Sequence, residues 1–236
     1  MTRLADPRLI VALDLPTVAQ AKALTNQIGD AVSFYKIGLQ LFASGGMGLA
    51  AELKALGKQV FLDWKLHDIG ATVEKAAAAL AGAGADLLTV HGEPQVMAAA
   101  VKGRGASSLK ILAVTVMTSL TDQDLAEMGY GLCATDLVQR RIGQALDLGC
   151  DGVVASALEA NIARAMATRA GRPDFLVVTP GIRPADAALD DQARVATPAD
   201  ALRSGASHLV IGRPISAAKD PRAAAQAIAA EMAAIA

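Results

Sequence analysis

Charged side chains interrupt an apolar stretch that otherwise has the pattern of a buried strand. The stretch is FLDWKLHDIGAT, residues 61–72. If residues 60–66 are extended, alternate side chains point to opposite faces, so Phe61, Asp63 and Lys65 share one face. An unpaired charge inside a sheet costs several kcal/mol, so Asp63 and Lys65 each require a partner of opposite sign.

Two further charges can complete this set. Asp68 lies three residues beyond Lys65, past the expected strand end, where it can face another direction or another subunit. Lys36 lies in a second short apolar run, FYKIGL. Two positive and two negative charges can alternate in space and neutralise one another. The alternative is that Asp63 and Lys65 form only a structural ion pair, because such pairs are also found outside functional sites.

The chemistry of such a set is proton donation to carbon. Carboxylates beside a lysine stabilise its ammonium form, which makes Lys65 a proton donor and not a Schiff-base nucleophile. This suits the loss of CO₂ from an anionic substrate. The leaving carboxylate meets Asp63 unfavourably, and the developing carbanion meets Lys65 favourably. The sequence leaves open which of these two effects lowers the barrier more.

Short apolar runs that alternate with helical patterns indicate how these residues are positioned. Strands are expected at residues 9–15, 34–39, 60–66, 86–92, 110–117, 152–157, 175–181 and 208–214. Helices are expected at residues 18–28, from the second strand to about 56, then 71–83, 94–102, 135–148, 158–168 and 221–235. Eight such units predict a (β/α)₈ TIM barrel, a single domain over residues 1–236. The competing doubly wound sheet lacks the GxGxxG fingerprint after its first strand.

Polar residues at the strand ends predict one site at the barrel mouth, because active sites of these barrels lie there. Asp14 follows the first strand, Thr118 the fifth and Arg183 the seventh. The long segment 180–197 is predicted to be a lid that brings Arg183 and Gln192 to an anion. The alternative is a solvated connection between two elements.

The dipeptide Gly212-Arg213 stands at the end of the eighth strand. Loops after strands seven and eight are frequent phosphate sites, so we expect Gly212 and Arg213 to bind an anion.

Composition narrows the function classes. The 236 residues are 53% hydrophobic and only 3% aromatic, so an aliphatic core is expected. The net charge of −1 gives no general attraction for nucleic acid or an anionic membrane. Cys133 and Cys150 have no metal-ligand spacing and indicate reduced thiols. With no signal peptide or membrane span apparent, we expect a cytoplasmic protein.

The remaining distinctive side chains have structural interpretations. The histidines His67, His91 and His208 form no metal-binding cluster, so no metal site is predicted. His91 is interpreted as a hydrogen-bonded residue at the rim, and His67 as its neighbour on the solvent side. Trp64 is assigned to the core beneath the helices.

The chain resembles the orotidine 5′-phosphate decarboxylase family of the bacterial type. The motifs that carry the resemblance are DWKLHDIGATV, ALDL, FYKIGL, VTVMTSL, TPGIRP, DDQARVATP and VIGRPI. It implies a cytoplasmic homodimer that makes UMP and CO₂ from orotidine 5′-phosphate in pyrimidine synthesis, without metal or cofactor. It also implies that Lys65 protonates the pyrimidine C6, that Asp63 lies near the departing carboxylate and that Lys36 completes the charge network.

The same resemblance implies roles for the other rim residues. Asp68 and Thr72 would reach into the site of the partner subunit, Asp14 would bind ribose and Thr118 the pyrimidine. The phosphate would be held by Arg183, Gln192, Gly212 and Arg213.

Two alternatives compete with this function. Metal-dependent sugar-phosphate lyases of the same superfamily, 3-keto-L-gulonate 6-phosphate decarboxylase and hexulose-phosphate synthase, share the DxKxxD strand. They help to hold Mg²⁺ with a glutamate near the end of the second strand, where this chain has Lys36. The second alternative is a catalytically silent phosphoribosyl-binding barrel, which has no need for two carboxylates near an anionic ligand.

Overall fold

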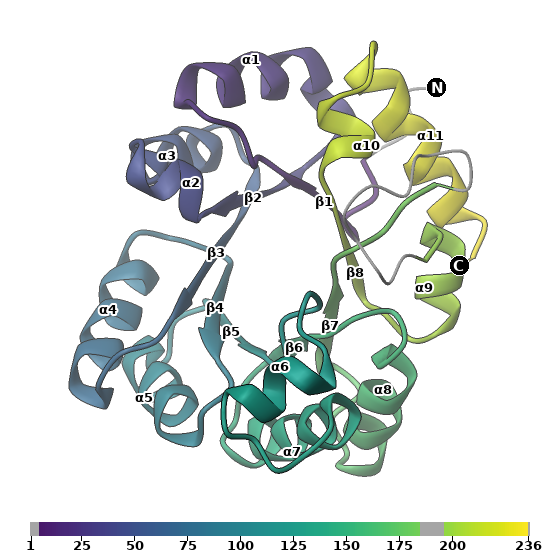
Figure 1. Cartoon of the computed structure of the whole chain (residues 1–236). Coiled ribbons are helices and arrows are strands. Elements are labelled where there is room, and N and C mark those ends of the chain that lie inside the picture. The colour runs from purple at the N-terminus through teal and green to yellow at the C-terminus, as the bar shows by residue number, and fades with distance from the viewer. Residues whose placement is uncertain (1–4, 185–195, 236) are drawn as a thin grey trace.

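A closed barrel of eight parallel strands forms the centre of the molecule (Figure 1). The computed structural model describes residues 5–184 and 196–235. The strands are β1 Leu9–Ala12, β2 Phe34–Gly38, β3 Gln59–Leu66, β4 Leu87–His91, β5 Lys110–Val114, β6 Gly152–Val154, β7 Leu176–Thr179 and β8 His208–Ile211. Neighbouring strands pair in chain order and β8 pairs with β1. The (β/α)₈ barrel expected from the sequence is therefore confirmed.

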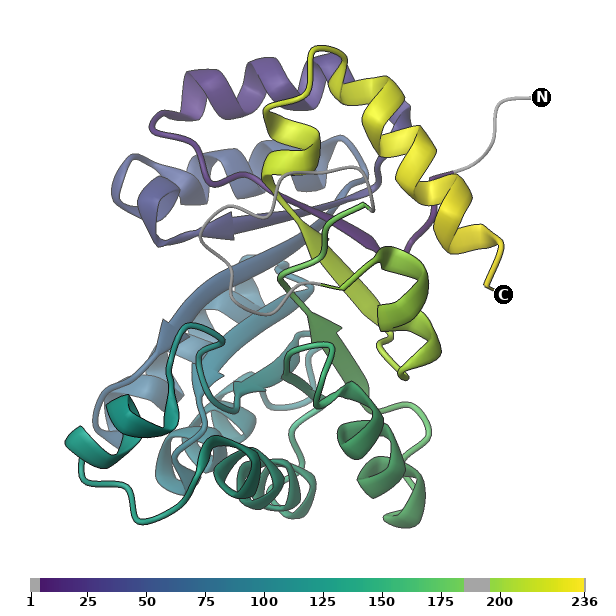
Figure 2. The ribbon, with the colours of Figure 1, turned by 45° about the vertical axis from the view of Figure 1, so that its right-hand side comes forward.

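Helices surround the barrel. They are α1 Val18–Ile28, α2 Leu39–Ala43, α3 Gly46–Ala55, α4 Gly70–Gly82, α5 Pro94–Arg104, α6 Asp122–Glu127, α7 Ala134–Asp147, α8 Ala160–Arg169, α9 Pro198–Arg203, α10 Arg213–Ser216 and α11 Pro221–Ala233, with a 3₁₀ turn η1 at Gly29–Ala31. Figures 1 and 2 both show α11 beside α1, where Arg222 donates a hydrogen bond of 3.0 Å to the Ile28 carbonyl. The first and last helices thus complete the ring. No helix in the described ranges is both long and apolar enough to cross a membrane.

The strands separate two apolar layers, as alternation of side chains requires. The barrel interior is filled by Ile10, Ala12, Phe34, Phe61, Leu87, Leu112, Val178 and Val210. A larger aliphatic layer lies between the strands and the helices. Trp64 belongs to this outer layer, with 8% of its surface exposed and its ring centroid 4.4 Å from that of Phe42. The core position expected for Trp64 is confirmed.

Several expected boundaries were wrong. Strands β1, β6 and β8 each end three residues before the expected end, at Ala12, Val154 and Ile211. The single helix expected after β2 is divided into α2 and α3, because Gly45 adopts a left-handed φ of 102° between them. A Cβ on Gly46 would lie 2.9 Å from the Leu41 carbonyl oxygen, so the close approach of the two helices requires glycine there. The strand expected over residues 110–117 ends at Val114, and residues beyond it form the irregular rim of the barrel.

Strand β3 leaves regular pairing where its charged residues lie. Leu62 pairs with Leu88, but the next pair joins Leu66 to Val90, so β3 has extra residues opposite β4. Among the non-glycine residues of the described ranges, Lys65 alone has a positive φ, which is 47°. Bulges re-aim side chains next to active sites, and this one directs Lys65 at the barrel mouth.

A half-buried histidine at the opposite end of the barrel gives a prediction about stability. His208 begins β8, and its ring meets the Phe34 ring edge-on with centroids 6.1 Å apart. Burial lowers the pKa of His208 to about 4, so between pH 6.5 and 4 the unfolded chain binds a proton that the folded chain does not. We therefore expect the titration of His208 to lower the free energy of unfolding by roughly 3 kcal/mol as the pH falls through that window. Urea unfolding at pH 7 and at pH 4.5 measures the loss.

Substitution separates this histidine from the other groups that titrate in acid. His208→Gln is expected to reduce the loss of stability between the two pH values, whereas His67→Gln, at an exposed position, serves as the control. Equal acid sensitivity in the parent and the His208→Gln variant would contradict the prediction.

Candidate active site

Four charged side chains at the carboxyl ends of β1, β2 and β3 form a row of alternating sign. Lys36 Nζ lies 2.9 Å from Asp14 Oδ1 and 3.3 Å from Asp63 Oδ2. Lys65 Nζ lies 2.8 Å from Asp63 Oδ1. The order in space is thus Asp14, Lys36, Asp63, Lys65. Lys36, Asp63 and Lys65 were expected to alternate with Asp68, which is absent from the row within this chain. Asp14, predicted at the same rim, takes that place because β1 and β2 are adjacent.

Lys36 and Asp63, the two buried members of the row, shift the pKa of each other. Burial alone lowers the pKa of Lys36, but Asp63 and Asp14 outweigh it and raise that pKa above its usual value. Burial alone raises the pKa of Asp63, but Lys36 and Lys65 outweigh it and the pKa falls below its usual value. Lys36 and Asp63 therefore stabilise each other in the ionised form, and Lys65 Nζ lies directly beside the Asp63 carboxylate.

A glycine makes room for this row. Gly38 pairs with Asp63 across β2 and β3. A Cβ on Gly38 would lie 2.7 Å from Asp14 Oδ1 and 3.2 Å from Lys36 Nζ. The contact between the Asp14 carboxylate and the Lys36 ammonium therefore depends on the absence of a side chain at this position.

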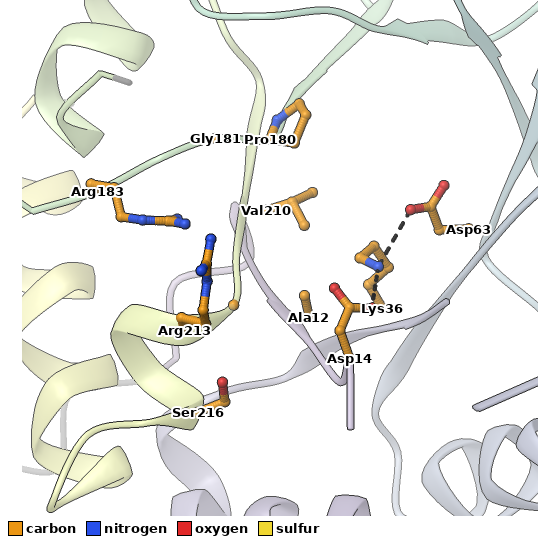
Figure 3. Close-up of a pocket in the computed structure, with 11 residues that line it drawn as sticks. Ala12, Asp14, Lys36, Asp63, Pro180, Gly181, Arg183, Val210, Arg213 and Ser216 are labelled. Atoms are coloured by element: carbon orange, nitrogen blue, oxygen red, sulfur yellow. Dashed lines mark hydrogen bonds and ion pairs between the residues drawn. The ribbon is translucent and has the colours of Figure 1, made fainter. Parts of the chain in front are cut away.

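The row borders a polar cavity of about 380 Å³. Its lining consists of Gly212 and the ten residues labelled in Figure 3. Figure 3 shows Arg183 and Arg213 on one side of the cavity and Lys36 and Asp63 on the other. Arg183 is 7% exposed and donates a hydrogen bond of 3.0 Å to the Ile182 carbonyl. An anion beside the two guanidinium groups would therefore lie across the cavity from the charged row.

A second cavity, of about 230 Å³, adjoins the first and shares Lys36, Asp63, Pro180 and Val210 with it. Its other walls are largely apolar and are formed by Phe61, Lys65, Val114, Val116, Met117, Thr118, Ser119 and Val154. A flat ring with polar edges fits such a space. The charged row lies where the two cavities meet, so a group that links a ring to an anion would pass directly over it.

Two of the predicted site residues, Asp68 and Thr72, lie outside the cavities of this chain. Asp68 and Thr72 are exposed, and the Asp68 carboxylate accepts a hydrogen bond of 2.7 Å from the Ile69 N–H. Neither lines the cavities described above. Gln192 lies outside the described residues, as does most of the predicted lid. Within the described ranges, no group of three or more His, Cys, Asp or Glu side chains is placed to bind a metal ion.

Two histidines, His67 and His91, lie together at the rim. His67 is exposed, as predicted, and its ring centroid lies 4.7 Å from that of His91. His91 is half-buried at the end of β4, and burial lowers its pKa. Its ring packs against that of His67, and the hydrogen bond expected for His91 stays a prediction.

Two polar residues of the site, Thr89 and Ser216, were not predicted from the sequence. Thr89 is fully buried in β4 and donates a hydrogen bond of 3.0 Å to Asp63 Oδ1. In the sequence it reads as an ordinary β-branched strand residue within LLTVH. Ser216 lines the polar cavity from α10. A hydroxyl at the centre of an otherwise apolar strand, level with Asp63, is the signal that could have identified Thr89.

The chain is similar in sequence and in structure to proteins of one family. The model of the family described as "Orotidine 5'-phosphate decarboxylase / HUMPS family" matches residues 7–228. A protein named orotidine 5′-phosphate decarboxylase from Caulobacter vibrioides (strain NA1000 / CB15N) is 68% identical over 231 residues, covering 98% of this chain and 99% of that protein. Another of that name, from Methylobacterium radiotolerans, is 58% identical over 235 residues, covering 99% of this chain and 100% of the relative. The crystal structure of orotidine 5′-phosphate decarboxylase from Lactobacillus acidophilus matches with a TM-score of 0.82 and 38% identity, over 96% of this chain and 99% of that one.

Proposed function

The chain belongs to the orotidine 5′-phosphate decarboxylase / HUMPS family, and from this premise we propose that it converts orotidine 5′-phosphate to UMP and CO₂. The resemblance found in the strand motifs is thereby confirmed at the level of the family. The observation that carries the proposed activity is the Lys36–Asp63–Lys65 array, with a lysine ammonium 2.8 Å from a carboxylate at the junction of two cavities. The reaction is a step of pyrimidine synthesis, and the two free thiols, Cys133 and Cys150, fit a reducing cytoplasm.

The two cavities suggest how the substrate lies. The phosphate occupies the polar cavity beside Arg183 and Arg213, with Gly212 at its edge. Gln192, which lies outside the described residues, stays a predicted phosphate ligand. The ribose lies near Asp14. The pyrimidine enters the second cavity, where Thr118 meets its polar edge. In this placement C6 and its carboxylate face Asp63 and Lys65.

The array then performs the reaction without a metal or cofactor. The bond between C6 and the carboxyl carbon breaks, CO₂ leaves, and the electron pair remains on C6. C6 takes a proton from the Lys65 ammonium, and Lys65 later regains a proton from solvent. Asp63 disfavours the bound carboxylate, whereas Lys65 stabilises the negative charge as it develops, so both favour the transition state over the bound substrate.

We further propose a homodimer in which Asp68 and Thr72 contribute to the site of the partner. Both side chains are exposed beyond the end of β3, and Ile69, between them, is 72% exposed. A large apolar side chain so exposed beside a carboxylate fits a surface that a second subunit covers.

A direct assay tests the activity. Purified protein is mixed with orotidine 5′-phosphate, and the loss of substrate absorbance and the formation of UMP are followed with and without EDTA. We expect full turnover in both cases, because Lys36 places a cation against Asp63 and so opposes a divalent metal there. Turnover of a sugar phosphate that EDTA abolishes would favour the metal-dependent members of the family instead.

Removal of a phosphate contact gives a quantitative test. Arg213→Ala is expected to lower kcat/KM for orotidine 5′-phosphate, because a charged hydrogen-bonding partner of the phosphate is lost. The fall should correspond to a loss of about 2 to 4 kcal/mol of transition-state stabilisation. Binding energy from this remote group helps to hold the reacting carboxylate against Asp63. Arg203→Ala is the control, since Arg203 is exposed on α9 and pairs with Asp200 at 3.1 Å. Unchanged kinetics in Arg213→Ala would remove Arg213 from the site.

A further inference from the structure

A buried hydroxyl joins the two residues at the centre of the charged row. Thr89 lies in the middle of β4 with 0% of its surface exposed. Its Oγ1 donates to Asp63 Oδ1 at 3.0 Å and accepts the Lys65 backbone N–H at 2.9 Å. A threonine hydroxyl has one proton to donate and lone pairs to accept, so a single atom satisfies both groups.

The irregular pairing of β3 explains why this hydroxyl is required. Between the pairs Leu62–Leu88 and Leu66–Val90, Thr89 is the β4 residue that faces the bulged segment of β3. The Lys65 N–H therefore bonds to the Thr89 side chain and not to a strand carbonyl. A residue in a sparsely populated backbone region costs about 1 to 3 kcal/mol and persists only where its surroundings hold it. The Thr89 hydroxyl is such a constraint on Lys65, whose φ is 47°.

The same hydroxyl also orients the carboxylate. Asp63 Oδ1 accepts both the Thr89 hydroxyl and the Lys65 ammonium, at 3.0 and 2.8 Å, while Oδ2 faces Lys36 at 3.3 Å. The three contacts fix the rotation of the carboxylate about its own bond. Thr89 thus sets the direction of Asp63 through its donor and the backbone of Lys65 through its acceptor.

We propose that Thr89 is a positioning residue for the decarboxylation, holding Asp63 and Lys65 in the geometry in which carbon dioxide leaves and C6 is protonated. The inference rests on the proposed function, since it names the group that preorganises the same site. Thr89 lies behind Asp63 and lines neither of the two cavities, so its effect acts through its two partners and not through the substrate. It is therefore expected to change kcat and to leave KM almost unchanged.

The test compares isosteric variants of buried threonines. Thr89→Val keeps the volume and removes the hydroxyl, and we expect kcat to fall roughly 10- to 100-fold because Asp63 and the Lys65 N–H each lose a buried partner. KM should stay within about threefold of the parent value. Thr89→Ser restores the hydroxyl and should return kcat to within about threefold of the parent.

Thr179→Val is the matched control, because Thr179 is also fully buried in the barrel and its hydroxyl has no hydrogen-bond partner among the described residues. Thermal unfolding verifies that each variant is folded, and Thr89→Ala replaces Thr89→Val if the valine does not fold. A kcat of Thr89→Val within twofold of the parent, or equal losses in the valine and serine variants, would overturn the role of Thr89. A parent protein without turnover would overturn the proposed function and, with it, the role that rests on it.

Discussion

Replacement of Lys65 by alanine is expected to abolish turnover of orotidine 5′-phosphate while the barrel stays folded. In the proposed mechanism the ammonium of Lys65 donates the proton to C6, and a positioned general acid contributes roughly 10²- to 10⁴-fold to a rate. The same charge also stabilises the carbanion before proton transfer, a contribution on the order of 10²- to 10³-fold in comparable electrostatic sites. The combined loss in kcat should be at least about 10⁴-fold, as measured with purified protein at saturating substrate.

Stability should change little, because Asp63 keeps the Lys36 ammonium and the Thr89 hydroxyl as partners when Lys65 is removed. Lys54→Ala is a matched control. Lys54 and Lys65 have side chains of similar exposure, 32% and 30%, and Lys54 forms an equally short ion pair with Asp86 at the other end of the barrel. Lys54→Ala should keep its activity. Activity of Lys65→Ala within tenfold of the parent would exclude Lys65 as the acid.

The sequence was sufficient to predict the barrel because its strands and helices differ clearly in period. The helix Val18–Ile28 was predicted with its observed bounds, since Pro16 and Thr17 mark its start. Errors occurred where tertiary packing decides the local structure. The division of α2 from α3 depends on Gly46 approaching Leu41, and no spacing along the chain reveals such an approach.

The charged row was predictable for a similar reason. Lys36, Asp63 and Lys65 are conspicuous within apolar runs, because burial of a charge requires a partner. Thr89 is not conspicuous, because a threonine in a strand needs no functional explanation. The bulge that gives Thr89 its importance changes the pairing of β3 with β4 and leaves no mark in the composition of either strand. Likewise, the need for glycine at position 38 is apparent only from the Asp14 carboxylate that lies over it.

The proposed contribution of Asp68 to the partner subunit predicts that two inactive variants restore activity when mixed. Within one chain the Asp68 carboxylate accepts the Ile69 N–H and is exposed, away from the Asp63–Lys65 pair. Asp68→Ala alone should lower kcat at least about 100-fold, because the proposed site loses a negative charge beside the lysines.

In a two-fold symmetric dimer, each site would take Lys65 from one chain and Asp68 from the other. A heterodimer of Lys65→Ala and Asp68→Ala chains therefore contains one site that lacks both residues and one site that is intact. Random exchange of subunits makes about half of the dimers mixed, each with one working site of two, so activity should rise to about a quarter of the parent value. The control mixes Asp68→Ala with the double variant Lys65→Ala/Asp68→Ala, which cannot rebuild a complete site. If Asp68 acted within its own chain, neither mixture would gain activity, so a mixture of the single variants that stays inactive after verified exchange would refute the shared site.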